Sequence, residues 1–155
     1  MTSDRQDDAV AMRPRYPDLE GRRVVVTGAA AGIGLATATA FAEQGCRLIL
    51  NDIDEPKLAG VADRLRAGGA GVEIAAGSIA DPQAVERLFA AADSAWGGVD
   101  VLVNNAGISM NMPTLDLSLE DWRRALDINL TGVFLSARAA APRMIAQHRG
   151  VILNL

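Results

Sequence analysis

Short apolar runs alternate with longer amphipathic stretches along most of this chain, and no other feature restricts its fold as strongly. The runs are rich in β-branched residues, which suit strands that are covered on both faces. The longer stretches repeat apolar residues at helical spacing, as Leu58, Val61 and Leu65 do. Strands that alternate with helices form a parallel sheet with helices on both faces. The sequence therefore predicts an α/β fold, a doubly wound parallel sheet, with strands at residues 24–26, 47–51, 72–76, 100–104 and 151–155.

Residues that favour helix ends stand where the predicted helices begin. Asp54 can cap the second helix, and Asp81 followed by a proline is a typical start for the third. Ser118 and the acid three residues later resemble a capping box. A long helix is predicted over about residues 130–147, and Pro142 inside it should kink the helix or lie near its end.

Length and composition narrow the classes of function. The 155 residues fit one domain, which we place at residues 21–155, after a mobile N-terminal extension at residues 1–20 that lacks periodicity. The net charge of −4 leaves no basic stripe for nucleic acid. No apolar run approaches the roughly 18 residues of a membrane span, and the N-terminus carries no secretory signal. We therefore expect a cytoplasmic protein.

The chain has one cysteine, Cys46, and one histidine, His148. These numbers exclude an intrachain disulfide and a Cys/His metal cluster, so no metal site is expected. Cys46 precedes an apolar run, which favours a buried structural thiol over a reactive one. His148 stands in a polar stretch, which favours a surface loop over a catalytic role.

A glycine-rich turn, Thr-Gly-Ala-Ala-Ala-Gly-Ile-Gly at residues 27–34, joins the first predicted strand to the first predicted helix. Glycines let a backbone approach a pyrophosphate closely, and the helix start offers free N–H groups and the positive end of its dipole. Glycines also mark ordinary tight turns, so the spacing alone is weak evidence. No Lys-Ser or Lys-Thr follows, which excludes a Walker-type site. The strand before and the helix after the turn favour a Rossmann-type dinucleotide site.

Asp52 ends the second predicted strand, 18 positions after Gly34. Rossmann-type sites place an acid about 20 residues on, where it accepts hydrogen bonds from the adenosine ribose hydroxyls. A carboxylate there repels a 2′-phosphate, and Ala31 and Ile53 supply no basic partner for one. The sequence therefore predicts NAD(H) over NADP(H). The alternative is that Asp52 only opens a turn or caps the next helix, although Asp54 already suits the cap.

Three motifs together resemble the short-chain dehydrogenase/reductase family. They are the glycine turn, Asn-Asn-Ala-Gly at residues 104–107 and Asp-Ile-Asn-Leu-Thr-Gly at residues 127–132, in the order and spacing of that family. The resemblance runs from about residue 21 to residue 155. It implies an oxidoreductase that transfers a hydride between NAD(H) and a small alcohol or ketone substrate, with a homo-oligomeric full-length form.

The resemblance also implies roles for single residues. Asn129 matches the asparagine of the catalytic tetrad, which helps to hold a water beside the active-site lysine. Ser78 departs from the acid that the family usually places at the adenine edge, so its hydroxyl or the N–H of Ile79 would serve there. The remaining cofactor contacts would come from Gly28, Gly32, Ile33 and Gly34 at the pyrophosphate, Asp52 with Ala31 and Ile53 at the ribose, and Asn104, Ala106 and Gly107 along the nucleoside.

The family's reaction needs a serine, a tyrosine and a lysine in a Tyr-x-x-x-Lys pair, within hydrogen-bond reach of the substrate. The only tyrosine is Tyr16 and the only lysine is Lys57, so the pair is absent. The resemblance thus implies a fold truncated after the fifth strand and a chain that is inactive alone. A non-catalytic dinucleotide-binding module and an inactive fragment remain alternatives. An uncovered fifth strand would be an apolar sheet edge, which predicts marginal stability or self-association.

Overall fold

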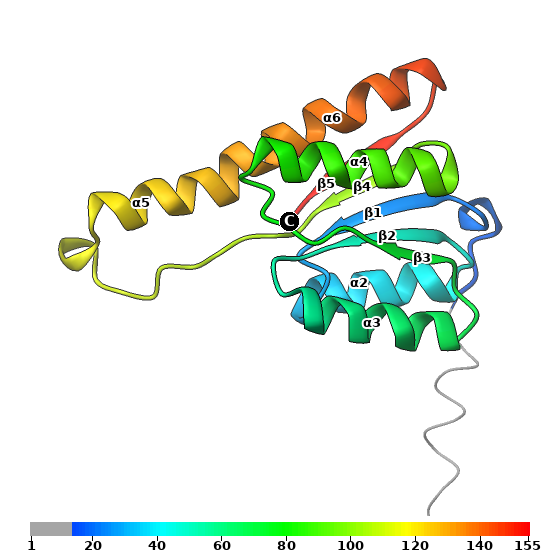
Figure 1. The fold of residues 1–155 in the computed structure, drawn as a ribbon, viewed down its shortest axis with the longest axis horizontal. Coiled ribbons are helices and arrows are strands. Elements are labelled where there is room, and N and C mark those ends of the chain that lie inside the picture. Colours follow the sequence, from blue (N-terminus) through cyan, green and yellow to red (C-terminus); the bar gives the residue numbers. More distant parts are fainter. Residues whose placement is uncertain (1–13) are drawn as a thin grey trace, which may run out of the picture.

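The computed structural model describes residues 14–155, which form a five-stranded parallel sheet between two layers of helices (Figure 1). The sheet order is β3-β2-β1-β4-β5. The chain therefore builds outward from β1 to β3 and then returns to the other side of β1. This reversal leaves a crevice at the carboxyl ends of β1 and β4, where doubly wound sheets bind ligands. The strands are β1 (Arg23–Thr27), β2 (Arg47–Asn51), β3 (Val72–Ile74), β4 (Val101–Asn104) and β5 (Val151–Asn154).

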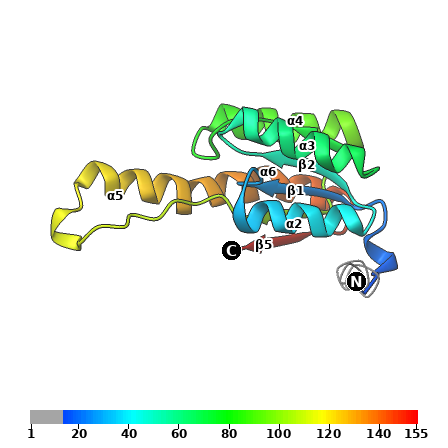
Figure 2. The ribbon, with the colours of Figure 1, turned by 90° about the horizontal axis from the view of Figure 1, so that it is seen from below.

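Two helices cover each face of the sheet, as the two views of Figure 1 and Figure 2 show together. Val24 and Val26 of β1 pack with the helices α2 (Gly32–Glu43) and α3 (Glu55–Ala67). Val25, which points to the other face, packs with α4 (Pro82–Trp96) and α6 (Gly132–Ala146). The three valines are fully buried. A run of β-branched residues thus fills both layers of the core, and the predicted doubly wound α/β fold is confirmed.

The predicted helix caps are confirmed. The Asp54 side chain accepts a hydrogen bond from the backbone N–H of Lys57, and that of Asp81 accepts one from Gln83. Ser118 accepts one from the N–H of Asp121 at the start of α5 (Leu119–Leu126). Each bond satisfies an N–H group that the first turn of a helix leaves free.

The predicted long helix is longer and less regular than the sequence indicates. A π-helical turn at Asp127–Thr131 joins α5 to α6 with helical backbone angles at both junctions. Residues 119–146 therefore form one helical arm, and Figure 1 shows its α5 end extending beyond the sheet. Pro142 lies in the last turns of α6. Strand bounds also differ slightly from prediction, since β3 ends at Ile74 and β4 begins at Val101.

The N-terminal extension that we expected at residues 1–20 is described only from residue 14, because residues 1–13 lie outside the described part. A short 3-10 turn at Pro17–Leu19 follows. The N–H of Tyr16 donates to the Gln44 side chain at 2.8 Å, and Leu19 packs against the core. The packed part of the chain thus begins before Gly21.

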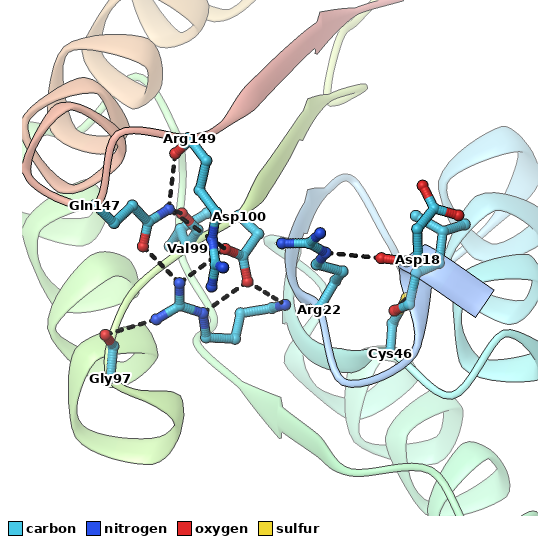
Figure 3. Close-up of polar contacts among 10 residues, drawn as sticks. Asp18, Arg22, Cys46, Gly97, Val99, Asp100, Gln147 and Arg149 are labelled. Carbon is cyan, nitrogen blue, oxygen red and sulfur yellow. Dashed lines mark hydrogen bonds and ion pairs between the residues drawn. The ribbon is translucent and has the colours of Figure 1, made fainter. Parts of the chain in front are cut away.

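At the amino ends of the strands, a buried carboxylate joins β1, β4 and the segment between α6 and β5 (Figure 3). Asp100 accepts hydrogen bonds from the backbone and side chain of Arg23 at 2.7–3.0 Å and from Arg149 at 3.0 Å. Gln147 accepts from the Arg23 guanidinium and donates to the Val99 carbonyl. This cluster fixes the end of the sheet opposite the crevice.

Cys46 is buried, and its thiol lies 3.2 Å from the carbonyl oxygen of Leu19. The predicted burial of this thiol is therefore confirmed, and burial raises its pKa to about 11. His148 is exposed in the loop after α6.

Among residues 14–155, no helix is long and apolar enough to cross a membrane. The same residues contain no group of three His, Cys, Asp or Glu side chains placed to hold a metal ion.

Candidate functional site

The glycine turn at the end of β1 is packed so tightly that side chains would not fit at two of its positions. A Cβ atom on Gly28 would lie 2.8 Å from the Cα atom of Ala106, and Gly28 also has a φ of +65°. A Cβ atom on Gly34 would overlap the carbonyl oxygen of Gly28. Gly32 differs, because nothing lies within 4 Å of the position that its Cβ would take. The turn is therefore close-packed on the side that faces the loop after β4, and it is open at Gly32, where α2 begins.

Thr27 and Asn105 hold this turn against the loop after β4. The Thr27 hydroxyl donates to the Val103 carbonyl and accepts from the N–H groups of Asn105 and Ala106 at 3.1 Å. The Asn105 amide donates to the carbonyl oxygens of Thr27 and Gly28 at 2.9 and 3.1 Å. The sequence analysis placed Asn104 in the site and missed Asn105. The adjacent pair of asparagines was the signal, but only packing decides which of the two faces β1.

Asp52 stands at the carboxyl end of β2, half-buried at the mouth of the crevice. One carboxylate oxygen accepts from the N–H of Ala30 at 2.9 Å, and the other accepts from the N–H of Asp54 at 3.1 Å. The bond from Asp54 forms a turn after β2, as expected if Asp52 had only the role of opening a turn. The first bond orients the carboxylate toward the glycine turn. Because each carboxylate oxygen has about two acceptor sites, Asp52 can accept further hydrogen bonds.

A cavity of about 340 Å³ lies at the carboxyl ends of β1, β2 and β4. Nine of the predicted site residues line it: Gly28, Ala31, Gly32, Asp52, Ile53, Ser78, Ile79, Ala106 and Gly107. The other lining residues are Asn51, Gly77, Asn105, Ile108 and Ile128, which the sequence analysis did not single out. Asp52 is the only charged residue among them. The cavity is thus mostly apolar, with one carboxylate and no basic side chain.

The loop after β3 forms the wall of the cavity beyond Asp52. The Asn51 amide donates to the carbonyl oxygens of Ala75 and Gly77 and holds this loop against β2. The Ser78 hydroxyl accepts from the N–H of Ala80 at 3.2 Å and keeps its own proton to donate. Ile79 is buried against Gly132, where a Cβ atom would lie 2.7 Å from the isoleucine side chain. Gly132 thus lets the helical arm approach this wall.

Asn129 lies in the π-helical turn and fixes the loop that follows β4. Its side-chain oxygen accepts from the N–H of Ile108, and its amide donates to the carbonyl oxygen of the same residue, both at 2.8 Å. Asn129 itself does not line the cavity, but Ile108 does. The asparagine therefore acts on the cavity wall through the backbone of its neighbour.

Three other predicted residues do not line the cavity. The side chain of Ile33 is 68% exposed, and Gly34 is buried beneath the turn. Asn104 is buried, and its amide donates to the Asn154 side chain of β5 at 2.9 Å. Its side-chain oxygen has no partner among the described residues. Asn104 therefore faces the β4–β5 ladder and not the crevice.

Comparison with known proteins is consistent with this arrangement. The family profile described as short chain dehydrogenase matches residues 22–155. The 3beta-hydroxysteroid dehydrogenase 1 of Eggerthella lenta is 39% identical over 145 residues, which cover 90% of this chain and 54% of that protein. The glucose 1-dehydrogenase of Gluconobacter oxydans is 44% identical over 119 residues, which cover 76% of this chain and 45% of that protein. The chain spans about half the length of these curated relatives.

Solved structures agree in fold. A short chain dehydrogenase/reductase from Burkholderia phymatum, in complex with NAD, matches with a TM-score of 0.85 and 36% identity over 88% of this chain and 49% of that chain. The L-sorbose reductase from Gluconobacter frateurii, complexed with NADPH and L-sorbose, matches with a TM-score of 0.84 and 32% identity over 87% of this chain and 52% of that chain.

Proposed function

This chain belongs to the short-chain dehydrogenase family, and from that premise we propose that its cavity binds NAD(H) as the cofactor-binding portion of an oxidoreductase. One observation carries the proposal: the open side of a close-packed glycine turn adjoins a cavity whose only charged lining residue is Asp52. In the longer protein the bound dinucleotide supplies or accepts the hydride exchanged with an alcohol or ketone.

The residues present fit a dinucleotide. The pyrophosphate would be held in front of Gly32, where free N–H groups and the positive end of the α2 dipole favour an anion. The turn is formed by Gly28, Ile33 and Gly34, and Ala31 in the same turn lines the cavity. The N–H bond from Ala30 holds Asp52 where a ribose would meet it.

The nucleoside half would be held between Ile53, Ser78 and Ile79 on one side and Ala106 and Gly107 on the other. Asn104 lies outside the cavity lining, and its bond to Asn154 joins β4 to β5 just before the wall formed by Ala106 and Gly107. Asn129 keeps the tetrad position that the family resemblance implies, and its two bonds to Ile108 support that role by fixing the loop beside the reacting end.

The choice between the two nicotinamide dinucleotides depends on charge. The related structures hold NAD in one case and NADPH in the other, so they do not distinguish the two. A phosphate on the adenosine ribose would meet the Asp52 carboxylate, and no lysine or arginine lines the cavity to compensate. Like charges a few ångströms apart near a protein surface repel by up to a few kcal/mol. We therefore assign NAD(H) as the cofactor.

Equilibrium titrations with NADH and NADPH test this assignment. The parent chain should bind NADH about tenfold or more tightly than NADPH. Asp52→Asn keeps an acceptor for the Ala30 N–H but removes the charge, so it should bring the two dissociation constants to within about threefold. Asp63→Asn, on the exposed side of α3, is the matched control and should keep the parent preference. An unchanged preference in Asp52→Asn would contradict the NAD(H) assignment.

We propose that oxidation of an alcohol requires a longer protein that also carries the Tyr-x-x-x-Lys pair. Tyr16 and Lys57 lie outside the cavity lining, and Lys57 pairs with Asp54 on α3. We expect this chain to bind NADH without oxidising any alcohol, and a longer protein that carries a Tyr-x-x-x-Lys pair to be active. Measurable turnover by the 155-residue chain would refute this division of roles. An inactive longer protein that still binds NADH would favour a non-catalytic binding module.

A further inference from the structure

Beside the cavity lies a second hollow to which the proposed function gives no role. It has a volume of about 670 Å³ and shares Ser78 and Ile128 with the cavity, so the two spaces adjoin. Its other lining residues are Ala80 and four charged residues of the helical arm, namely Glu120, Arg123, Arg124 and Asp127.

The four charged side chains are available to a ligand. They recur three or four residues apart, so they share one face of the arm. Glu120 and Arg124 stand at a spacing that allows a pair along the helix, as do Arg123 and Asp127. Within the described residues, however, none of these four side chains forms a hydrogen bond or an ion pair. All four are exposed. The hollow therefore suits a polar group and not an apolar one.

The size of the cavity shows why a dinucleotide would reach this hollow. A volume of about 340 Å³ is near the lower end of the roughly 300–1,000 Å³ of ligand pockets. A dinucleotide has two nucleosides joined by a pyrophosphate, so its ends must extend beyond such a cavity. With the pyrophosphate at the glycine turn and the adenosine ribose at Asp52, the base would extend toward Ser78 and Ile128, which line the same cavity. These two residues form the boundary with the hollow.

Arg124 is the residue best placed to meet the base. It precedes Ile128 by four residues and so lies next to it on the same helix face. Its guanidinium group is planar, stacks on aromatic rings and donates several hydrogen bonds. The Ser78 hydroxyl accepts a bond from the N–H of Ala80 and keeps its proton to donate, so it can contact a ring nitrogen of the base beside Arg124.

We propose that the charged face of α5 recognises the base of the dinucleotide, with Arg124 as the contacting residue. This inference rests on the proposed function, since it requires the adenosine half to lie at Asp52. It assigns the face a part in selecting the base, separate from the part that Asp52 has in selecting the ribose substituent.

Two dinucleotides that differ only in the base provide the test. One is NADH, and the other is its analogue with cytosine in place of adenine. Arg124→Ala should weaken NADH binding by about 3- to 20-fold. It should weaken binding of the cytosine analogue less than about twofold, because a single pyrimidine ring offers a guanidinium less stacking surface than a purine does. Arg64→Ala, an exposed arginine in the last turns of α3, is the matched control and should change neither constant.

An equal loss for both dinucleotides, or no loss for either, would overturn the proposal, because Arg124 would then act without touching the base. Circular dichroism of the variant should match that of the parent, since Arg124 has no partner to lose. If the folded parent bound neither dinucleotide, the proposed function would fail as well, which is a different result from equal losses.

Discussion

Asp100 shows how one buried charge is stabilised by its neighbours. The side chain is only 5% exposed. Burial by itself would raise its pKa, but hydrogen bonds from the side chain and backbone of Arg23, together with the charges of Arg23 and Arg149, outweigh burial and hold the pKa well below its usual range. The ionised form is therefore the one that the fold stabilises.

The pH dependence of stability follows from this shift. A carboxylate whose folded-state pKa is lowered contributes stability above its unfolded pKa of about 3.9, and that stability is lost as the pH falls toward the folded value. We expect the free energy of unfolding to decrease below about pH 4. Urea titrations at several pH values measure it.

Asp100→Asn should lower stability at pH 7 by about 2–4 kcal/mol, because it leaves Arg23 poorly paired. It should also make the free energy of unfolding decrease less steeply below about pH 4. Asp63→Asn should do neither, because that side chain is 77% exposed. If the free energy of unfolding of Asp100→Asn decreased below about pH 4 as steeply as that of the parent, this role of Asp100 would be contradicted.

At the scale of elements, the π-helical turn matters because it places Asn129 against the loop after β4. A regular helix through residues 127–131 would rotate that side chain differently. The two hydrogen bonds to Ile108 are one contact through which the arm acts on the cavity, and Ile128 of the arm also lines it directly.

Asn129→Ala should therefore loosen that loop. We expect faster hydrogen exchange at the Ile108 amide and a loss of about 1–2 kcal/mol of stability, since two hydrogen bonds are removed. Asn111→Ala, an exposed position in the same loop, is the control and should leave the Ile108 exchange rate unchanged. Equal exchange in both variants would show that Asn129 does not hold the loop.

The helical arm also carries an uncovered apolar stripe, and β5 is an uncovered edge strand with all four residues exposed. Exposed apolar patches and strand edges promote association. The stripe consists of Leu119, Trp122, Leu126, Leu130 and Phe134.

We expect this chain to self-associate as its concentration rises, as the sequence indicated for the sheet edge. The family resemblance likewise predicts a homo-oligomer for the full-length form. Sedimentation velocity at several concentrations measures the effect. The double variant Leu130→Ser, Phe134→Ser should shift the chain toward the monomer. Leu115→Ser should not, although that residue is 99% exposed, because it lies outside the arm. A parent chain that stayed monomeric and melted cooperatively would contradict the expectation.

At the scale of the whole molecule, the sequence predicted those features of the fold that depend on residues a few positions apart. The alternation of apolar runs and helices predicted the five strands, and Asp54, Asp81 and Ser118 predicted helix starts, because these effects act within a few residues. The glycine turn and Asp52 were predicted as a site because strand ends meet at one edge of a parallel sheet.

Contacts between distant parts of the chain were not predicted. Asn105 bonds to Thr27, 78 residues earlier, and Arg23 to Asp100, 77 residues later. Such pairs depend on how the layers pack, and no local pattern specifies them. The π-helical turn was missed as well, and the hydrogen bonds that its Asn129 makes to Ile108 join residues 21 positions apart.

The central claim is that the cavity at the glycine turn holds a nicotinamide dinucleotide, and an equilibrium titration of the chain with NADH tests it most directly. The parent should bind saturably, and Asp52→Ala should weaken binding about tenfold or more, because the ribose loses a charged hydrogen-bond acceptor. Asp63→Ala should bind as the parent does. A folded parent that shows no saturable binding, or an Asp52→Ala variant that binds NADH as tightly as the parent, would contradict the account.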